Sequence, residues 1–227
     1  MTLHAVFFDF DGVIVDSEPL HFEGFRRILK TIGVELTRKA YYSDYLGYDD
    51  HDCFTTVVAD QGRRISPDQL RQLIEAKTQW MQKALAEQIE PLPGAVELIR
   101  QVTEAGVPTA ICSGALRQEI IVAARKVGVL ECFPRVIAAE DVREGKPAPE
   151  GYVLAKAAAE ETSGRTLARQ RCVVIEDSPA GIAAGKAAGM KVLAVATSYD
   201  PADLEQADRI LDRLTAVGLG DLESLVQ

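Results

Sequence analysis

Short apolar runs recur along the chain, and each ends at turn-forming or acidic residues. They lie at residues 5–8, 108–112, 136–139, 172–175 and 191–195. Short apolar runs bounded in this way are typical of strands that are buried on both faces. Between them, apolar residues return every three or four positions, as in the segment 116–127, which ends at Gly128 and is therefore predicted to be a helix. Strands and helices thus alternate along most of the chain.

Alternation of strands and helices indicates an α/β fold. A strand, a helix and a second, parallel strand connect in a right-handed unit, and repeats of this unit build a parallel sheet covered by helices on both faces. We therefore expect a Rossmann-like, three-layer core. In such a sheet the functional site lies beyond the carboxyl ends of the strands, so the residues that follow each apolar run are the candidates for chemistry.

The segment 17–90 interrupts this alternation, because it has helical periodicity and no convincing strand. Ser17 and Pro19 are typical of the start of a helix. Ser66 and Gln69 have the spacing of a capping box, which predicts the start of a second, long helix. The segment is therefore expected to be all-helical.

The insert has clear boundaries in the sequence. It leaves the alternating pattern just after the first strand and returns at the proline-rich stretch 91–94, which is typical of a linker. We expect a catalytic core formed by 1–16 and 91–227, and a small helical cap domain formed by 17–90.

Composition and charge narrow the class of protein. The chain has 227 residues, of which 47% are hydrophobic and 26% charged, as in an ordinary globular protein with a sizeable core. Its formal net charge is -9 without a long basic run, so we expect it to bind neither nucleic acid nor an anionic membrane surface. The sequence has no signal-like or membrane-spanning apolar run, and its four cysteines are scattered without a CxxC pair. A cytoplasmic enzyme with reduced thiols fits best.

Acidic residues follow two of the predicted strands. Asp9 and Asp11 come after the first apolar run, and Glu176 and Asp177 come after the fourth. Carboxylates gathered at the end of a sheet repel one another unless a cation or a shared proton compensates. Oxygen ligands of this kind are those that Mg²⁺ prefers. The alternative is helix capping, which would account for Asp177 but not for Glu176.

Two further segments supply groups that suit a phosphate. Lys146 stands between Gly145 and Pro147, whose restricted backbone fixes where the ammonium group points. Ser113 and Gly114 follow the second apolar run and offer a hydroxyl and an unhindered backbone amide before a helix. Taken alone, each has an ordinary alternative, a solvated surface lysine and a simple helix cap.

Together, in order and spacing, these four segments resemble the four motifs of the haloacid dehalogenase superfamily, and the resemblance spans essentially the whole chain. It is closest to the members with a helical cap inserted after the first motif, the group of β-phosphoglucomutase and many sugar-phosphate phosphatases. The stretch 9–21, DFDGVIVDSEPLH, is similar to the opening signature of that group. The resemblance also implies a Mg²⁺ cofactor.

The resemblance implies a role for each residue that matches a motif. Asp9 would attack phosphorus and form an aspartyl-phosphate while also binding the metal. Asp11 would be the general acid and base, with its backbone carbonyl on the metal. Asp177 would be a metal ligand, with Glu176 a direct or water-mediated one. Phosphoryl oxygens would be held by Ser113 and Gly114, and Lys146 would neutralise charge on the nucleophile and the transferring group.

Residues also discriminate within the superfamily. Asp11 favours phosphate esters, because dehalogenases need no acid there and phosphonatases place a small residue. His21 lies where the mutase has its cap-hinge histidine. However, the acids at 49–52 replace the mutase arginine that clamps a second phosphate, and Arg117 only partly substitutes for a lysine that the mutase carries after motif two. The acids are also explained by a solvated helix start, or by a hydroxyl-rich or cationic leaving group.

The sequence thus predicts a Mg²⁺-dependent phosphatase that acts on a small phosphorylated metabolite, with sugar phosphates the first class to test. The first alternative is a sugar-phosphate mutase. A catalytically silent member that binds a metabolite or a protein is the second. The sequence leaves the leaving group and the oligomeric state open.

Overall fold

The computed structural model describes residues 3–227, with the side chain of Ala216 excepted. The chain forms two compact units. The first, here called the core unit, combines the segment that ends at Asp16 with Ile89–Gln227. The second, here called the helical unit, is Ser17–Gln88.

A parallel sheet forms the centre of the core unit. Its strands, in chain order, are β1 (Ala5–Phe8), β2 (Thr109–Cys112), β3 (Val136–Ile137), β4 (Cys172–Glu176), β5 (Lys191–Val195) and β6 (Arg209–Leu211). In space the order is β3-β2-β1-β4-β5-β6, and every neighbouring pair is parallel. The strand that carries the first acidic pair therefore lies in the middle of the sheet, between β2 and β4.

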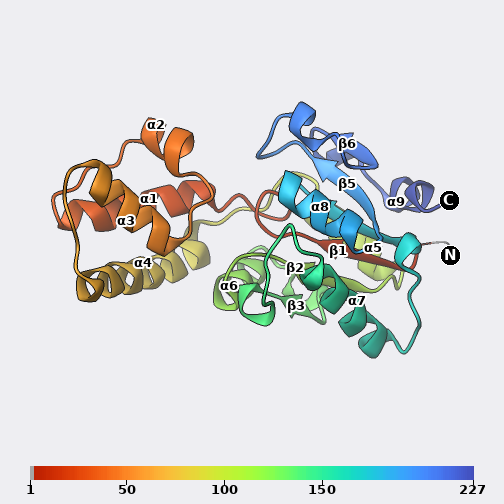
Figure 1. The fold of residues 1–227 in the computed structure, drawn as a ribbon. Helices are drawn as coiled ribbons and strands as arrows, with labels where there is room; N and C mark the ends of the chain where they lie inside the picture. The colour runs from red at the N-terminus through yellow and green to blue at the C-terminus, as the bar shows by residue number, and fades with distance from the viewer. Residues whose placement is uncertain (1–2) are drawn as a thin grey trace. The chain divides into compact units, whose positions relative to one another are not determined.

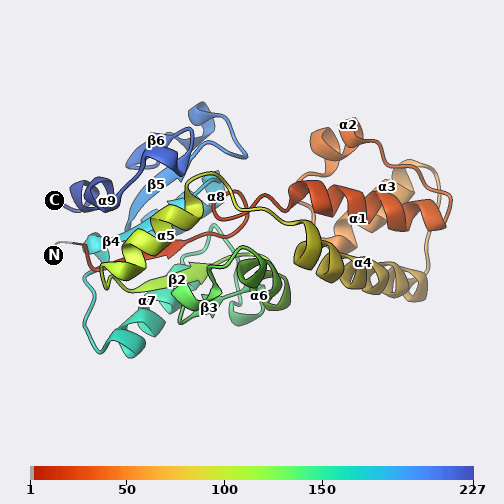
Figure 2. The ribbon, with the colours of Figure 1, turned by 180° about the vertical axis from the view of Figure 1, so that it is seen from behind.

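Helices cover both faces of this sheet. They are α5 (Ala95–Glu104), α6 (Arg117–Lys126), α7 (Glu150–Ser163), α8 (Pro179–Ala187) and α9 (Leu219–Leu225). Helices α7 and α8 lie on one face (Figure 1), and α5 and α6 lie on the other (Figure 2). The expected three-layer, Rossmann-like architecture is confirmed.

Alternation of side chains along the strands explains the layers. Phe7 points to the face that α7 and α8 cover, where it packs in one apolar cluster with Tyr152, Val174 and Ile182. Its neighbour Phe8 is also fully buried but lies outside this cluster, as expected when successive residues of a strand point to opposite faces. Apolar residues on both faces are why each strand reads as a continuous apolar run.

The helical unit contains α1 (Glu18–Thr31), α2 (Arg38–Ala40), α3 (Asp50–Asp60) and α4 (Pro67–Gln88), with a π-helical turn at Tyr41–Tyr45. An aromatic and aliphatic cluster that includes Phe25, Tyr41 and Phe54 forms its core. The capping box is present, because the Ser66 N–H donates to Gln69 Oε1 at 3.0 Å and the Gln69 N–H donates to Ser66 Oγ at 3.2 Å.

The acids at 49–52 begin a helix in the structure. Asp49 is the N-cap of α3, and its carboxylate accepts a hydrogen bond of 2.8 Å from the Asp52 N–H. Of the two interpretations of this stretch, helix capping is therefore sufficient for Asp49. Asp50 has a different role, because its carboxylate is paired with Lys77.

Two further observations bear on the sequence-based expectations. All four cysteines are free, and Cys53, Cys112 and Cys172 are buried. Among the described residues, no helix has both the length and the apolar character that crossing a membrane requires.

Candidate active site

The register of the sheet brings the two acidic pairs together. Phe8 lies opposite Ile175, and the Asp9 N–H donates to the Ile175 carbonyl at 2.9 Å. Strands β1 and β4 therefore end at the same edge of the sheet, and Asp9 lies beside Glu176 and Asp177. Ligand atoms of these three side chains lie within 4.8 Å of one another, and all three residues are buried.

Lys146 reaches this acidic group from the loop before α7. Its ammonium donates to Asp9 Oδ1 and to Glu176 Oε1, each at 2.5 Å. It also lies 5.3 Å from the centre of the Tyr152 ring. The structure thus brings Lys146, predicted from its glycine and proline neighbours, into contact with Asp9.

Glu176 is held by donors on both of its oxygens. Oε1 accepts from Lys146 and from the Tyr152 hydroxyl at 2.8 Å. Oε2 accepts from the Asp177 N–H at 3.0 Å and from the N–H and the hydroxyl of Ser178 at 3.2 and 3.0 Å. Protein groups alone therefore supply the hydrogen bonds of this buried carboxylate. The charged group that it contacts is the ammonium of Lys146.

The charge balance of the site fits a divalent cation. Three buried carboxylates, Asp9, Glu176 and Asp177, face the single ammonium of Lys146. When all three carboxylates are ionised, two negative charges are left without a partner in a place with little water, where unbalanced charge is costly. Oxygen donors at this spacing suit Mg²⁺. Because Glu176 already accepts five hydrogen bonds, Asp9 and Asp177 are the better placed ligands.

The pKa values follow from burial and from these neighbours. Burial raises the pKa of Asp9 well above its usual range, and the carboxylates of Glu176 and Asp177 add to the effect, while Lys146 opposes it. Burial likewise raises the pKa of Asp177, to about 7. Burial alone would lower the pKa of Lys146, but Asp9 and Glu176 outweigh it and raise that pKa. In Glu176 the hydrogen bonds and charge of Lys146 outweigh burial and lower the pKa.

The remaining core residues predicted for the site lie at the same edge of the sheet. Ser113 is buried at the end of β2, next to β1, and its Oγ accepts from the Ala115 N–H at 3.0 Å. Gly114 follows it, and a Cβ at that position would meet nothing within 4 Å. Asp11 is half-buried in the turn after β1, and its negative charge helps to raise the pKa of Asp177.

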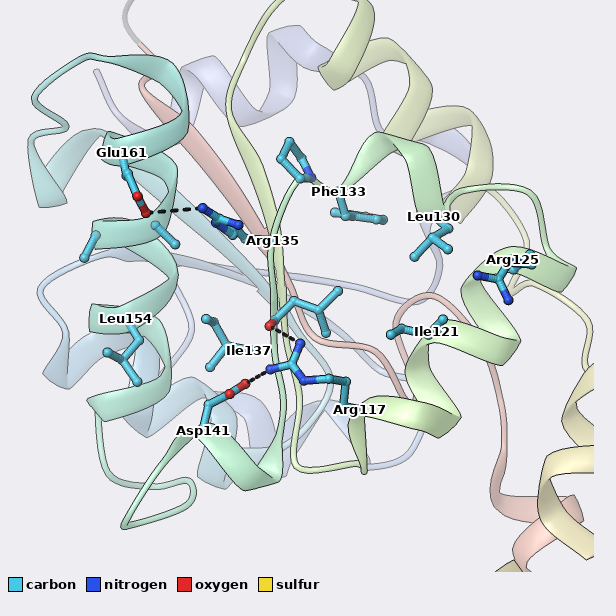
Figure 3. Close-up of a pocket in the computed structure, with 14 residues that line it drawn as sticks. Arg117, Ile121, Arg125, Leu130, Phe133, Arg135, Ile137, Asp141, Leu154 and Glu161 are labelled. Carbon is cyan, nitrogen blue, oxygen red and sulfur yellow. Dashed lines mark hydrogen bonds and ion pairs between the residues drawn. The ribbon is translucent and has the colours of Figure 1, made fainter. Parts of the chain in front are cut away.

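Within the core unit, Arg117 lies apart from this acidic group, and His21, the last predicted residue, belongs to the other unit. The guanidinium of Arg117 donates to Asp141 and, at 3.0 Å, to the Val136 carbonyl, so it lies along the edge strand β3 (Figure 3). His21 belongs to the helical unit, where its Nδ1 lies 3.0 Å from Lys77 Nζ.

Three residues that touch the site were not found from the sequence. Tyr152 holds Glu176, and the Ser198 hydroxyl donates to Asp177 Oδ2. Gly181 leaves the space that the Glu176 carboxylate fills. Only Gly181 gave a signal, because a glycine inside a helix is unfavourable and usually has a packing reason.

The core unit is a parallel α/β sheet, and a buried group of acids lies at the carboxyl edge of this sheet beside one lysine. This arrangement is typical of the active site of an α/β enzyme. The chain belongs to the haloacid dehalogenase-like hydrolases, whose family model matches residues 3–189. The resemblance predicted from the four motifs is thus confirmed.

Individual relatives agree with this assignment. Validoxylamine A 7'-phosphate phosphatase of Streptomyces hygroscopicus subsp. limoneus is 30% identical, over 92% of this chain and 93% of that protein. Hexitol phosphatase A of Escherichia coli is 38% identical, over 58% of this chain and 57% of that protein. The crystal structure of CbbY from Rhodobacter sphaeroides in complex with phosphate has a TM-score of 0.84 at 25% identity and covers 97% of this chain and 99% of that one. The expectation of a phosphoric monoester hydrolase of this superfamily is confirmed.

Proposed function

We propose that this chain is a Mg²⁺-dependent phosphatase that hydrolyses a small phosphorylated metabolite through an aspartyl-phosphate on Asp9. The observation that carries the proposal is the partly buried ion pair between Asp9 and Lys146, next to two further carboxylates. A carboxylate at this point can act as a nucleophile, and a fixed ammonium beside it can stabilise a transferring phosphoryl group.

In the first step, an oxygen of the Asp9 carboxylate attacks phosphorus and forms a new O–P bond. The ester P–O bond breaks, and the leaving oxygen takes a proton from Asp11, which acts as the general acid. Asp11 is then a carboxylate and accepts a proton from water, whose oxygen attacks the aspartyl-phosphate. Phosphate leaves, and the Asp9 carboxylate is restored.

Other residues bind and orient. Asp9, Asp177 and the backbone carbonyl of Asp11 would hold Mg²⁺, which supplies positive charge to the phosphoryl oxygens when bound. Ser113 and the Gly114 N–H would hold the phosphoryl oxygens.

Lys146 would neutralise charge on Asp9 and on the transferring group. Glu176 would chiefly fix this ammonium, because both of its oxygens accept protein hydrogen bonds. Its contact with the metal would then be through water.

Phosphorylated sugars or polyols are the substrate class to test first. The named relatives are phosphatases, one of a validoxylamine phosphate and one called a hexitol phosphatase. The helical unit, Ser17–Gln88, would act as the cap that selects the leaving group. The mutase alternative is less favoured, because Asp50 stands in the stretch where the mutase carries its phosphate-binding arginine.

The test is Mg²⁺-dependent hydrolysis of p-nitrophenyl phosphate by the Asp9→Asn variant. We expect a loss of at least a thousandfold in kcat, whereas Asp200→Asn, an exposed acid of the same unit, should keep the parent rate. Retention of full activity by Asp9→Asn would rule out the covalent mechanism.

A screen of phosphorylated metabolites then identifies the substrate. Efficient interconversion of hexose 1- and 6-phosphates that depends on a bisphosphate activator would replace phosphatase by mutase. Absence of turnover across the panel, with a ligand still bound, would favour the silent member.

A further inference from the structure

A hollow opens at the β3 edge of the core unit, between α6 and α7 (Figure 3). Its volume is about 760 Å³, within the range of small-molecule sites. The floor and walls are largely apolar and include Ile121, Leu130, Phe133, Ile137, Leu154 and Ala158. Of the residues predicted for phosphoryl transfer, only Arg117 lines it, and Arg117 lies apart from the acidic group, so the hollow needs an explanation of its own.

Three arginines line this hollow in a chain whose net charge is -9. Arg117 is fixed against the protein, because it donates to Asp141 and to the Val136 carbonyl. It therefore forms part of the wall and is not available to a ligand.

The other two arginines are available. Arg135 pairs with Glu161 at 3.3 Å, but both side chains are largely exposed, at 46% and 73%. Exposed pairs of this kind are worth only about 0–1 kcal/mol, so an incoming anion can replace Glu161. Arg125 forms no ion pair with any residue in the described part of the chain, 3–227. The hollow thus combines apolar surface with accessible guanidinium groups, which bind carboxylates and phosphates well.

The edge of the sheet is closed to an added strand. Strand addition would need free backbone groups on the outer side of β3. The Val136 carbonyl already accepts from Arg117, and the N–H of the following Ala138 donates to Asp141 at 2.8 Å. A peptide that extends the sheet is therefore a poor occupant, and a compact molecule that fills the hollow is a better one.

We propose that this hollow is a second ligand site, which binds a small organic anion with an apolar body. The body packs on the aliphatic and aromatic floor, and its acidic group is held by Arg135 in place of Glu161. Arg125 adds positive field from the α6 side. The site is separate from phosphoryl transfer and does not depend on it.

The probe is 4-phenylbutyrate, and its neutral isostere 4-phenylbutanamide is the matched control. We expect calorimetry to show one binding event for the carboxylate with Kd below 1 mM, and at least fivefold weaker binding for the amide. Arg135→Gln and Arg125→Gln should each weaken the carboxylate at least threefold. Ala158→Trp should abolish binding, because the indole fills the hollow. Arg165→Gln, which removes an exposed arginine outside the hollow, should leave Kd unchanged.

Circular dichroism and thermal unfolding confirm that each variant is folded before binding is compared. Equal binding of the acid and the amide would overturn the proposal, as would binding that survives Ala158→Trp. Absence of binding at 10 mM would overturn it as well. A dimer in sedimentation velocity that Ala158→Trp dissociates would assign the hollow to a second copy of the chain instead.

Discussion

Replacing Gly181 with alanine should displace Glu176 from the site. A Cβ on Gly181 would lie 1.8 Å from Oε1, 1.9 Å from Cδ and 2.1 Å from Oε2 of the Glu176 carboxylate. No real contact is this short, so one of the two groups must move. The glycine is part of α8 and its backbone is fixed by the helix, so the carboxylate would be forced out.

The magnitude follows from what Glu176 would lose. Its carboxylate is fully buried and accepts five hydrogen bonds, including those from Lys146 and Tyr152. Breaking a buried ion pair on one side costs about 3–5 kcal/mol. Alanine in a helix gains about 0.5–1 kcal/mol over glycine. The net loss in the free energy of unfolding should therefore be about 2–4.5 kcal/mol. The value of kcat should fall by at least a hundredfold, because Lys146 loses one of its two carboxylate partners.

Gly220 provides a matched control. It lies in the first turn of α9, as Gly181 lies in the first turn of α8, but a Cβ there would meet nothing within 4 Å. Gly220→Ala should be neutral or slightly stabilising and fully active. Urea unfolding and p-nitrophenyl phosphate kinetics would be measured for both variants. If Gly181→Ala matched Gly220→Ala in both assays, the assigned position and role of Glu176 would be wrong.

Three further predictions test neighbouring groups. Tyr152→Phe removes one hydrogen-bond donor from Glu176. It should lower kcat more than it raises KM, and it should lower the free energy of unfolding by about 1–2 kcal/mol. Steady-state kinetics and urea unfolding would measure these two effects. The pKa of Asp177 is raised to about 7, so Mg²⁺ must displace a proton below that pH. Calorimetry should show the affinity for Mg²⁺ falling as the pH drops below 7, by about tenfold per pH unit for each proton displaced. Asp177→Asn should weaken this dependence without removing it, because the pKa of Asp9 is raised as well. The pKa of His21 is lowered to about 3 by burial and by Lys77. Stability should then drop by about 1–2 kcal/mol as pH falls from 6.5 to 5, since only the unfolded chain takes up the proton; unfolding of His21→Asn should show a flatter profile.

The acidic site could be predicted from sequence because the same local pattern, a short apolar run followed directly by acids, occurs twice in the chain. Each strand is a short apolar run, and acids follow two of them directly. Parallel strands end at one edge, so Asp9 and Glu176 were expected at the same edge. That β1 and β4 are direct neighbours, which brings the two acids into contact, came only from the structure. Lys146 was found because glycine and proline flank it.

Other features depend on contacts between distant segments and left no clear pattern. The strand β6 (Arg209–Leu211) was missed, because its residues are only half-buried and form no apolar run. The predicted strand 136–139 is shorter in the structure and ends at Ile137. A 3-10 turn at Ala139–Asp141 follows instead, because the Ala138 N–H donates its hydrogen bond to the Asp141 carboxylate and not to another strand.

The helical unit contains an ion pair between Asp50 and Lys77 that bears on the choice of substrate and could not be found by counting charges in the sequence. From sequence, acids in place of a clamping arginine indicated a lost site for a second phosphate. In the structure, Asp50 is paired with Lys77, which is almost fully buried. His21 contacts the same ammonium and stays neutral, because burial and Lys77 lower its pKa. This cluster therefore carries one positive charge and one negative charge and has no spare cation. If the helical unit acts as the proposed cap, a second phosphate bound at this cluster would have to displace Asp50 and leave that carboxylate unpaired, whereas a neutral, hydroxyl-bearing group would not. We therefore propose a preference for monophosphate esters over bisphosphates, and bisphosphate-dependent isomerase activity would contradict it.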